Sequence, residues 1–73
     1  MLHNKVMDRK ALAIKIAQIR IAKNLSAYEL SLRIGKSTNY MHMVEAGKVN
    51  VSVDTLFEIC KALEIKPREL FTE

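Results

Sequence analysis

The sequence predicts an all-α fold, a compact bundle of five helices that contains a helix-turn-helix unit. Its 73 residues suit one small domain. Two glycines and one proline are too few turn-forming residues for an all-β chain of this length. Apolar residues make up 49% of the chain and recur at intervals of three and four, which is typical of helices with one buried face.

Residues 8–73 are predicted to form the helical domain, and residues 1–7 a flexible N-terminal segment. This segment lacks the apolar stretch of a secretory signal peptide, and no part of the chain is apolar enough to cross a membrane. Cys60 is the single cysteine, which excludes an intrachain disulfide and fits a reducing compartment. We therefore expect a cytoplasmic protein with no membrane partner.

The first two helices are predicted over residues 8–23 and 27–34. Asp8 and Ser26 are suitable N-caps because their side-chain oxygens can accept bonds from the free amides of a first helical turn. The apolar stripe of the first helix has the spacing i, i+4, i+7. Its members are Leu12, Ile16 and Ile19.

The remaining helices are predicted over residues 38–46, 53–63 and 67–71. Pro67 is tolerated in the first turn of the short last helix, and Leu70 and Phe71 are expected to fold back on the core. The helix over 53–63 has Ser52 as its expected N-cap and the clearest apolar stripe in the chain. This stripe consists of Val53, Leu56, Ile59, Cys60 and Leu63.

A tight connection, Gly35–Ser37, joins the second and third helices. Two short helices joined by a turn with a glycine form a helix-turn-helix unit. Ser37 is the expected N-cap of the third helix, and Ser31 is small enough to let the two helices approach closely. Such a unit is a common device for binding DNA in the major groove.

The charge is distributed unevenly along the chain. Residues 1–48 contain nine Lys or Arg and three acidic residues, which leaves a net charge of +6. Residues 49–73 contain three basic and five acidic residues, which leaves −2. This asymmetry fits a protein with one side facing a polyanion, and it also fits a solvated surface of uneven charge.

The third helix is predicted to have an inner and an outer face. At 100° per residue, Tyr40, Met41 and Val44 point inward. The outer face is compact and mostly polar, as in a helix that contacts base edges. Its members are Thr38, Asn39, His42 and Met43.

The segment 16–71 resembles the Xre family of helix-turn-helix domains, the Cro and phage-repressor type. The resemblance rests on the joint order and spacing of many residues rather than on one motif. The matching residues are Arg20, Leu25, Ser26, Glu29, Leu30, Gly35, Ser37, Tyr40, Val44, Glu45, Gly47, Lys48, Leu56, Ala62, Leu63, Leu70 and Phe71. It implies a lambda-repressor-like domain that binds operator DNA, usually as a dimer.

The resemblance also implies roles for particular residues. The third helix contacts bases, through Thr38, Asn39, His42 and Met43. Helix N-termini contact phosphates, and this role together with position in the sequence assigns phosphate contacts to Ser26, Tyr28, Lys36, Ser37, Tyr40 and Lys48, although the position of Tyr28 fits plain exposure equally well. Arg20 and Glu45 are expected to form a structural ion pair. The chain departs from the family at Ala27, where a phosphate-binding Gln is frequent, and at Ala46, where Asn is frequent.

These observations predict a sequence-specific, double-stranded DNA-binding transcriptional regulator of the repressor kind. We expect a homodimer formed by the second half of the chain. The alternative is an antitoxin-like or partner-binding module with weakened DNA binding. Ala27 and Ala46 favour it, as do apolar residues at positions that are expected to be polar, namely Ile14, Leu32, Val49 and Val51.

An enzyme is the least favoured class. The sequence shows no acid–base pair, no nucleophile with a base and no phosphate-binding loop. The two histidines, His3 and His42, do not have the spacing of metal ligands. We therefore expect no cofactor, no metal and no small-molecule substrate.

Overall fold

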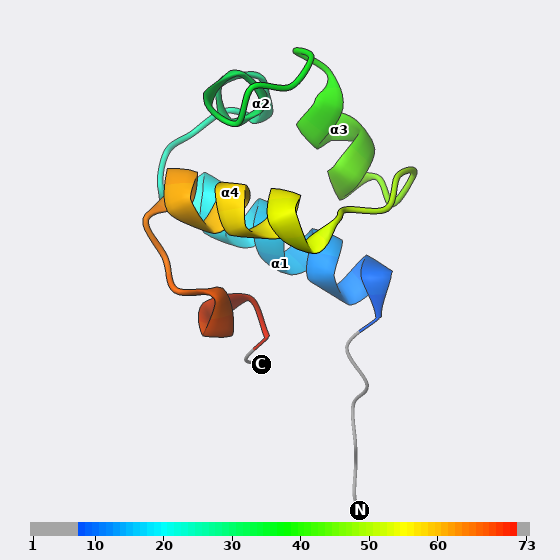
Figure 1. Ribbon diagram of the computed structural model, residues 1–73, viewed down its shortest axis with the longest axis vertical. Coiled ribbons are helices and arrows are strands. Elements are labelled where there is room, and N and C mark those ends of the chain that lie inside the picture. Colours follow the sequence, from blue (N-terminus) through cyan, green and yellow to red (C-terminus); the bar gives the residue numbers. More distant parts are fainter. Residues whose placement is uncertain (1–7, 72–73) are drawn as a thin grey trace, which may run out of the picture.

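The computed structural model describes residues 8–71, and the N-terminal segment predicted to be flexible lies outside them. Within this range there are no strands. The elements are α1 (Arg9–Ala22), α2 (Ala27–Arg33), α3 (Tyr40–Glu45), α4 (Val53–Leu63) and the 3-10 turn η1 (Pro67–Leu70) (Figure 1). The all-α prediction is confirmed. The expected fifth helix is a single 3-10 turn, since only four residues follow the helical path there.

Three of the helices begin at the polar residues that the sequence predicts. Asp8 Oδ1 accepts a hydrogen bond of 2.8 Å from the Ala11 amide at the start of α1. Ser26 Oγ accepts one of 2.9 Å from the Glu29 amide in α2. Ser52 Oγ does the same for the first turn of α4. These bonds satisfy amides that have no partner inside their helix.

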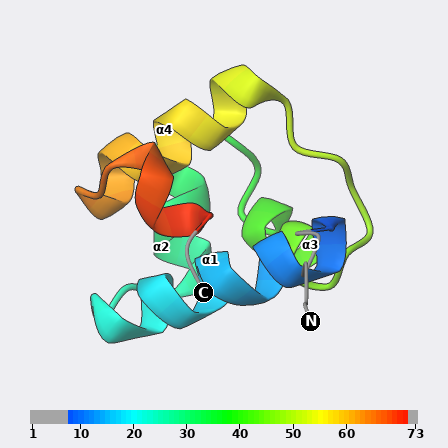
Figure 2. The same cartoon turned by 90° about the horizontal axis from the view of Figure 1, so that it is seen from below.

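The core lies between α1 and α4, with α2, α3 and η1 closing the space between them (Figures 1 and 2). Every element contributes at least one buried apolar side chain. The core consists of Ile16, Ala27, Leu30, Met41, Val44, Ile59, Cys60, Leu63 and Leu70. Leu12 and Ile19 of the predicted α1 stripe pack against it and are partly buried.

Three predictions of burial differ from the structure. Val53 is 64% exposed at the first position of α4, where Thr55 is buried in its place. Phe71 is also exposed, whereas Leu70 is fully buried as expected. Val49 and Val51, two of the apolar residues that favoured the partner-binding alternative, instead pack against the core as partly buried residues. The remaining two, Ile14 and Leu32, are half-exposed.

Cys60 is a free, buried thiol on the inner face of α4. Burial raises the pKa of this thiol above its ordinary value, and the Glu69 carboxylate raises it further. The neutral thiol is therefore the stable form in the core. No helix among residues 8–71 has both the length and the apolar character needed to cross a membrane.

Candidate nucleic-acid interface

The α2–α3 connection is longer than the sequence predicts. α2 ends at Arg33 and α3 begins at Tyr40, so residues 34–39 form the turn. Gly35 has φ +73°, a left-handed conformation that favours glycine. This conformation lets the Lys36 amide donate a 2.9 Å hydrogen bond to the Ser31 carbonyl, which closes the C-terminus of α2.

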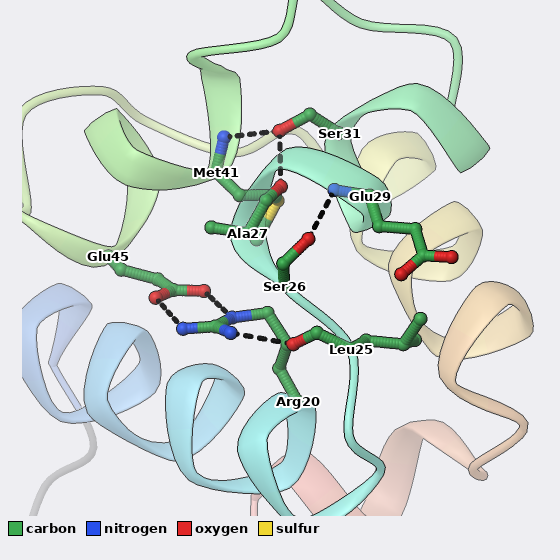
Figure 3. Close-up of polar contacts among 8 residues, drawn as sticks. All are labelled: Arg20, Leu25, Ser26, Ala27, Glu29, Ser31, Met41 and Glu45. Atoms are coloured by element: carbon green, nitrogen blue, oxygen red, sulfur yellow. Dashed lines mark hydrogen bonds and ion pairs between the residues drawn. The ribbon is translucent and has the colours of Figure 1, made fainter.

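Ser31 links α2 directly to α3. Its hydroxyl donates to the Ala27 carbonyl at 2.8 Å and accepts from the Met41 amide at 2.9 Å (Figure 3). Ser31 is fully buried, and α3 has no capping bond from the side chain of Asn39, its N-cap residue. A side chain of α2 therefore satisfies an amide in the first turn of α3 and fixes the distance between the two helices.

Arg20 fixes the opposite end of α3. Its Nε and Nη2 donate to the two carboxylate oxygens of Glu45 at 2.7 and 2.9 Å, and its Nη1 donates to the Leu25 carbonyl at 2.7 Å (Figure 3). The side chains of Arg20 and Glu45 are only 13% and 14% exposed. The bond to Glu45 raises the pKa of Arg20 above its ordinary value, although burial opposes this. The pair that the resemblance implied thus joins α1, α3 and the start of α2.

α3 has the inner and outer faces that the sequence predicts, but it begins at Tyr40 rather than at residue 38. Met41 and Val44 are buried and Tyr40 is partly buried, as predicted. His42 is exposed on the helix. Thr38 and Asn39 are exposed too, but they belong to the turn before α3 rather than to the helix. The expected cap Ser37 instead accepts the Tyr40 amide with its backbone carbonyl, at 3.0 Å.

The residues assigned to phosphate contact lie on the surface, apart from the partly buried Tyr40. The Lys36 ammonium lies 5.3 Å from the centre of the Tyr40 ring, a distance at which a cation is attracted to an aromatic face. Lys48 follows Gly47, whose φ of +74° lets the Lys48 amide bond to the Met43 carbonyl and close α3. Tyr28 is 55% exposed in the first turn of α2.

The electrostatics of this region are cationic. Arg20 and Arg33 are paired with Glu45 and Glu29, so their charges are balanced within the fold. Lys36 and Lys48 are exposed and form no ion pair with any residue in the range 8–71. Their charges remain available to an anion in solution. No group of three His, Cys, Asp or Glu side chains in this range could hold a metal ion.

Ser31 contributes more to the position of α3 than the sequence alone indicates. The sequence indicates its small size but not its hydrogen bond to α3, because that bond depends on how two helices approach one another. Ala27 is buried, although it occupies a position where the family frequently has a Gln that contacts phosphate at the surface. It is only 5% exposed and belongs to the core, so its side chain does not contribute to the surface.

Comparisons with known proteins agree with this geometry. A family model described as helix-turn-helix matches residues 16–70. The chain is 36% identical over 64 residues to the HTH-type transcriptional regulator y4dJ of Sinorhizobium fredii, a match that covers 88% of this chain and 83% of that one. It is 37% identical over 57 residues to the control protein C.BamHI of Bacillus amyloliquefaciens, with 77% and 70% covered.

A solved structure shows the same fold. The restriction-modification controller protein C.AhdI of Aeromonas hydrophila superimposes with a TM-score of 0.83 and 35% sequence identity, over 90% of this chain and 100% of that one. The family match includes all of α2, the turn, α3 and α4, the elements that position the candidate interface. The chain therefore belongs to the Xre-type helix-turn-helix family of DNA-binding transcriptional regulators.

Proposed function

We propose that this protein binds an operator in double-stranded DNA as a homodimer and acts as a cytoplasmic, non-enzymatic repressor, with α3 in the major groove. The observation that carries the proposal is the rigid presentation of one exposed, mostly polar surface. α3 is fixed at its start by Ser31 and at its end by Arg20, while Thr38, Asn39 and His42 remain exposed. A preorganised polar surface of this size fits recognition of base edges.

The base contacts are assigned to the turn before α3 and to its outer face. Asn39 has the donor and acceptor pair that bonds an adenine edge bidentately, and Thr38 offers a hydroxyl and a methyl group. His42 lies one helical turn further along and can donate or accept one bond. Met43 is partly buried and offers only apolar contact.

The phosphate contacts are assigned to the residues around the two helices. Lys36 and Lys48 supply positive charge before and after α3, while Tyr28 and Ser37 supply hydroxyl groups on the surface. The Tyr40 hydroxyl and the Ser26 hydroxyl have the same role, since capping uses Ser26 as an acceptor and leaves its proton available. Such contacts position a protein on any duplex.

The homodimer is assigned to α4. Val53 and Phe57 are 64% and 53% exposed and lie one turn apart on its outer face. Asp54 and Lys61 flank Phe57 at nearly equal distances along the helix. When two copies of α4 pack antiparallel about a two-fold axis near Phe57, each Asp54 opposes the Lys61 of the other copy. The same surface is then self-complementary in shape and in charge.

The partner-binding alternative has less support than the regulator. The buried position of Ala27 explains an alanine there by packing, without a loss of DNA binding. The similar proteins described above are named as regulators or controllers. The apolar residues Val49 and Val51 contribute to the core rather than to a free surface.

The test compares two substitutions on two kinds of DNA. An operator is first selected from a random pool, and binding is then measured on it and on random duplex over a range of salt. Lys48→Ala should weaken binding to both and reduce the slope of log K against log salt by about one unit, because one phosphate contact is lost. Asn39→Ala should cost about 1–3 kcal/mol on the operator and leave the slope unchanged.

Lys66→Ala is the control for the loss of a positive charge. Lys66 precedes η1, which lies at the opposite end of the molecule from the α2–α3 turn (Figure 1). This variant should keep the wild-type affinity and slope. Equal losses for Asn39→Ala on both DNAs would contradict base recognition by Asn39. Absence of any salt-dependent binding by the wild-type protein would reject the proposed function.

A further inference from the structure

A concave site lies beside the candidate interface but is lined by none of the exposed residues assigned to it. It is a half-open cavity of about 300 Å³ between the N-terminal half of α1 and the loop that connects α3 to α4. Its residues are Arg9, Leu12, Ala13, Ile16, Val44, Val49, Asn50 and Val51. The volume is at the lower end of the range for ligand pockets, so a small molecule is the size that fits.

The interior of this cavity is aliphatic. Ala13, Ile16 and Val44 are almost fully buried and form its floor, while Val49 and Val51 are partly buried and form its wall. Among the described residues, none that lines the cavity is aromatic or acidic. A short saturated chain is therefore the kind of group that this floor can remove from water.

The mouth of the cavity is polar and cationic. Arg9 and Asn50 are both exposed, and Arg9 Nη1 donates a hydrogen bond to Asn50 Oδ1, which ties the first turn of α1 to the loop. Arg9 forms no ion pair within residues 8–71. A guanidinium has five N–H groups, so donors remain in a planar arrangement that matches a carboxylate.

We propose that this cavity binds a small aliphatic carboxylate, with its chain against the partly buried Leu12, Val49 and Val51 above this floor and its carboxylate on Arg9. The charge at the mouth selects an anion over a neutral or cationic molecule of the same length, because Arg9 is the only charged lining group among residues 8–71. The binding site does not use the residues assigned to DNA contact. The proposal therefore stands or falls independently of the proposed function.

The test uses hexanoate as the probe, with 1-hexanol as the uncharged control of equal chain length. Each is titrated into the full chain, and methyl resonances of Ile16, Val44, Val49 and Val51 are followed by NMR. Hexanoate should shift these methyls saturably and bind about fivefold more tightly than hexanol, the gain expected from a solvent-exposed charge pair. Arg9→Gln should abolish this preference, whereas Arg68→Gln, which removes the same charge from η1, should retain it.

Three outcomes would overturn the proposal. The first is the absence of saturable methyl shifts with hexanoate. The second is equal affinity for hexanoate and hexanol, or loss of the preference in Arg68→Gln as well as in Arg9→Gln. The third is a set of nuclear Overhauser contacts from residues 1–7 to Val49 and Val51, which would mean that the chain itself occupies the cavity. Because Arg9 is exposed, a folded Arg9→Gln is expected, and its dispersed NMR spectrum verifies this.

Discussion

The Arg20 guanidinium links three segments that are separate in the sequence. It bonds to Glu45 at the end of α3 and to the Leu25 carbonyl before α2, and both charged side chains are largely shielded from water. A bidentate pair of this kind has a fixed geometry as well as an attraction. The pair therefore sets the position of α3 relative to α1, which is what a helix needs if it is to contact bases reproducibly.

We predict that Arg20→Ala destabilises the fold by about 3 kcal/mol, because it leaves the Glu45 carboxylate shielded and unpaired. In a domain of this size the thermal midpoint should fall by more than about 10 °C. Arg33→Ala is the matched control, since Arg33 and Glu29 are half-exposed and 3.7 Å apart. That change should cost at most about 0.5 kcal/mol. Equal midpoints for Arg20→Ala and the wild type would refute the structural role.

A second prediction concerns the effect of the Cys60 thiol on the free energy of unfolding at alkaline pH. Its pKa is raised in the fold, so the folded protein retains a proton that the unfolded chain has lost. The stability that this thiol contributes is complete below its unfolded pKa and is lost as pH rises above it. As pH rises above about 8.5, the ordinary pKa of a thiol, the free energy of unfolding should therefore decrease, by at most about 1.4 kcal/mol per pH unit.

Cys60→Ala isolates this contribution, because the other titrating groups are common to both proteins. Urea denaturation at several pH values should show a steeper loss of stability in the wild type than in the variant. Cys60→Ala should also be less stable at neutral pH, because a buried side chain is shortened. Parallel pH profiles for the two proteins would mean that the thiol does not resist ionisation in the core.

At the scale of elements, the sequence predicts the start of a helix correctly where the N-cap side chain and the amide that it binds lie close together in the chain. Asp8, Ser26 and Ser52 each bond to an amide three residues along the same chain, so a short stretch of sequence contains the whole interaction. The predicted start of α3 at residue 38 is wrong, because the structure begins this helix at Tyr40. The Met41 amide in its first turn bonds to Ser31, which is ten residues away in another helix. Thr38 and Asn39 were accordingly assigned to the helix although they lie in the turn.

The sequence predicts which residues are buried only where it also indicates which side of a helix faces the core. The regular spacing in α4 identified Ile59, Cys60 and Leu63 correctly, and these residues are buried. Thr55 takes the place that was given to Val53, because its hydroxyl accepts a bond from the Ser52 hydroxyl and is satisfied when buried. A polar residue with a local partner can therefore occupy an inward position that hydropathy assigns to an apolar one.

Ser31 provides the prediction at this scale. Ser31→Ala removes the acceptor of the buried Met41 amide and should destabilise the protein by about 1–3 kcal/mol. Operator affinity should fall by more than global unfolding explains, since the start of α3 loses its contact with α2. The control is Gln18→Ala, an exposed polar residue of α1 with no assigned contact to DNA, which should change stability by less than about 0.5 kcal/mol. Operator affinity in Ser31→Ala that is unchanged under fully folded conditions would contradict the positioning role.

At the scale of the whole molecule, charge and exposed apolar area are separated. The exposed lysines Lys36 and Lys48 flank α3, whereas the largest exposed apolar side chain of α4, Phe57, has Asp54 on one side along the helix and Lys61 on the other. A positive surface suits DNA, and an apolar surface with both charge signs suits a second copy of the same chain. Since a single helix in one groove contacts few base pairs, two copies are needed to recognise an operator with useful selectivity.

The antiparallel α4 dimer makes the last prediction, which a charge exchange tests. Asp54→Lys and Lys61→Asp should each weaken dimerisation, by about tenfold, because each places two pairs of like charges across the interface. The double variant restores opposite charges in the reverse order and should recover most of the affinity.

The apolar contact is tested separately. Phe57→Ser should shift the protein to monomer, while Ile21→Ser, at an apolar and 62% exposed position on α1, should not. Sedimentation at micromolar concentration, with and without operator DNA, measures all five proteins. A double variant that dimerises no better than either single variant would exclude this register, because in it the exchanged charges at positions 54 and 61 face and attract one another again.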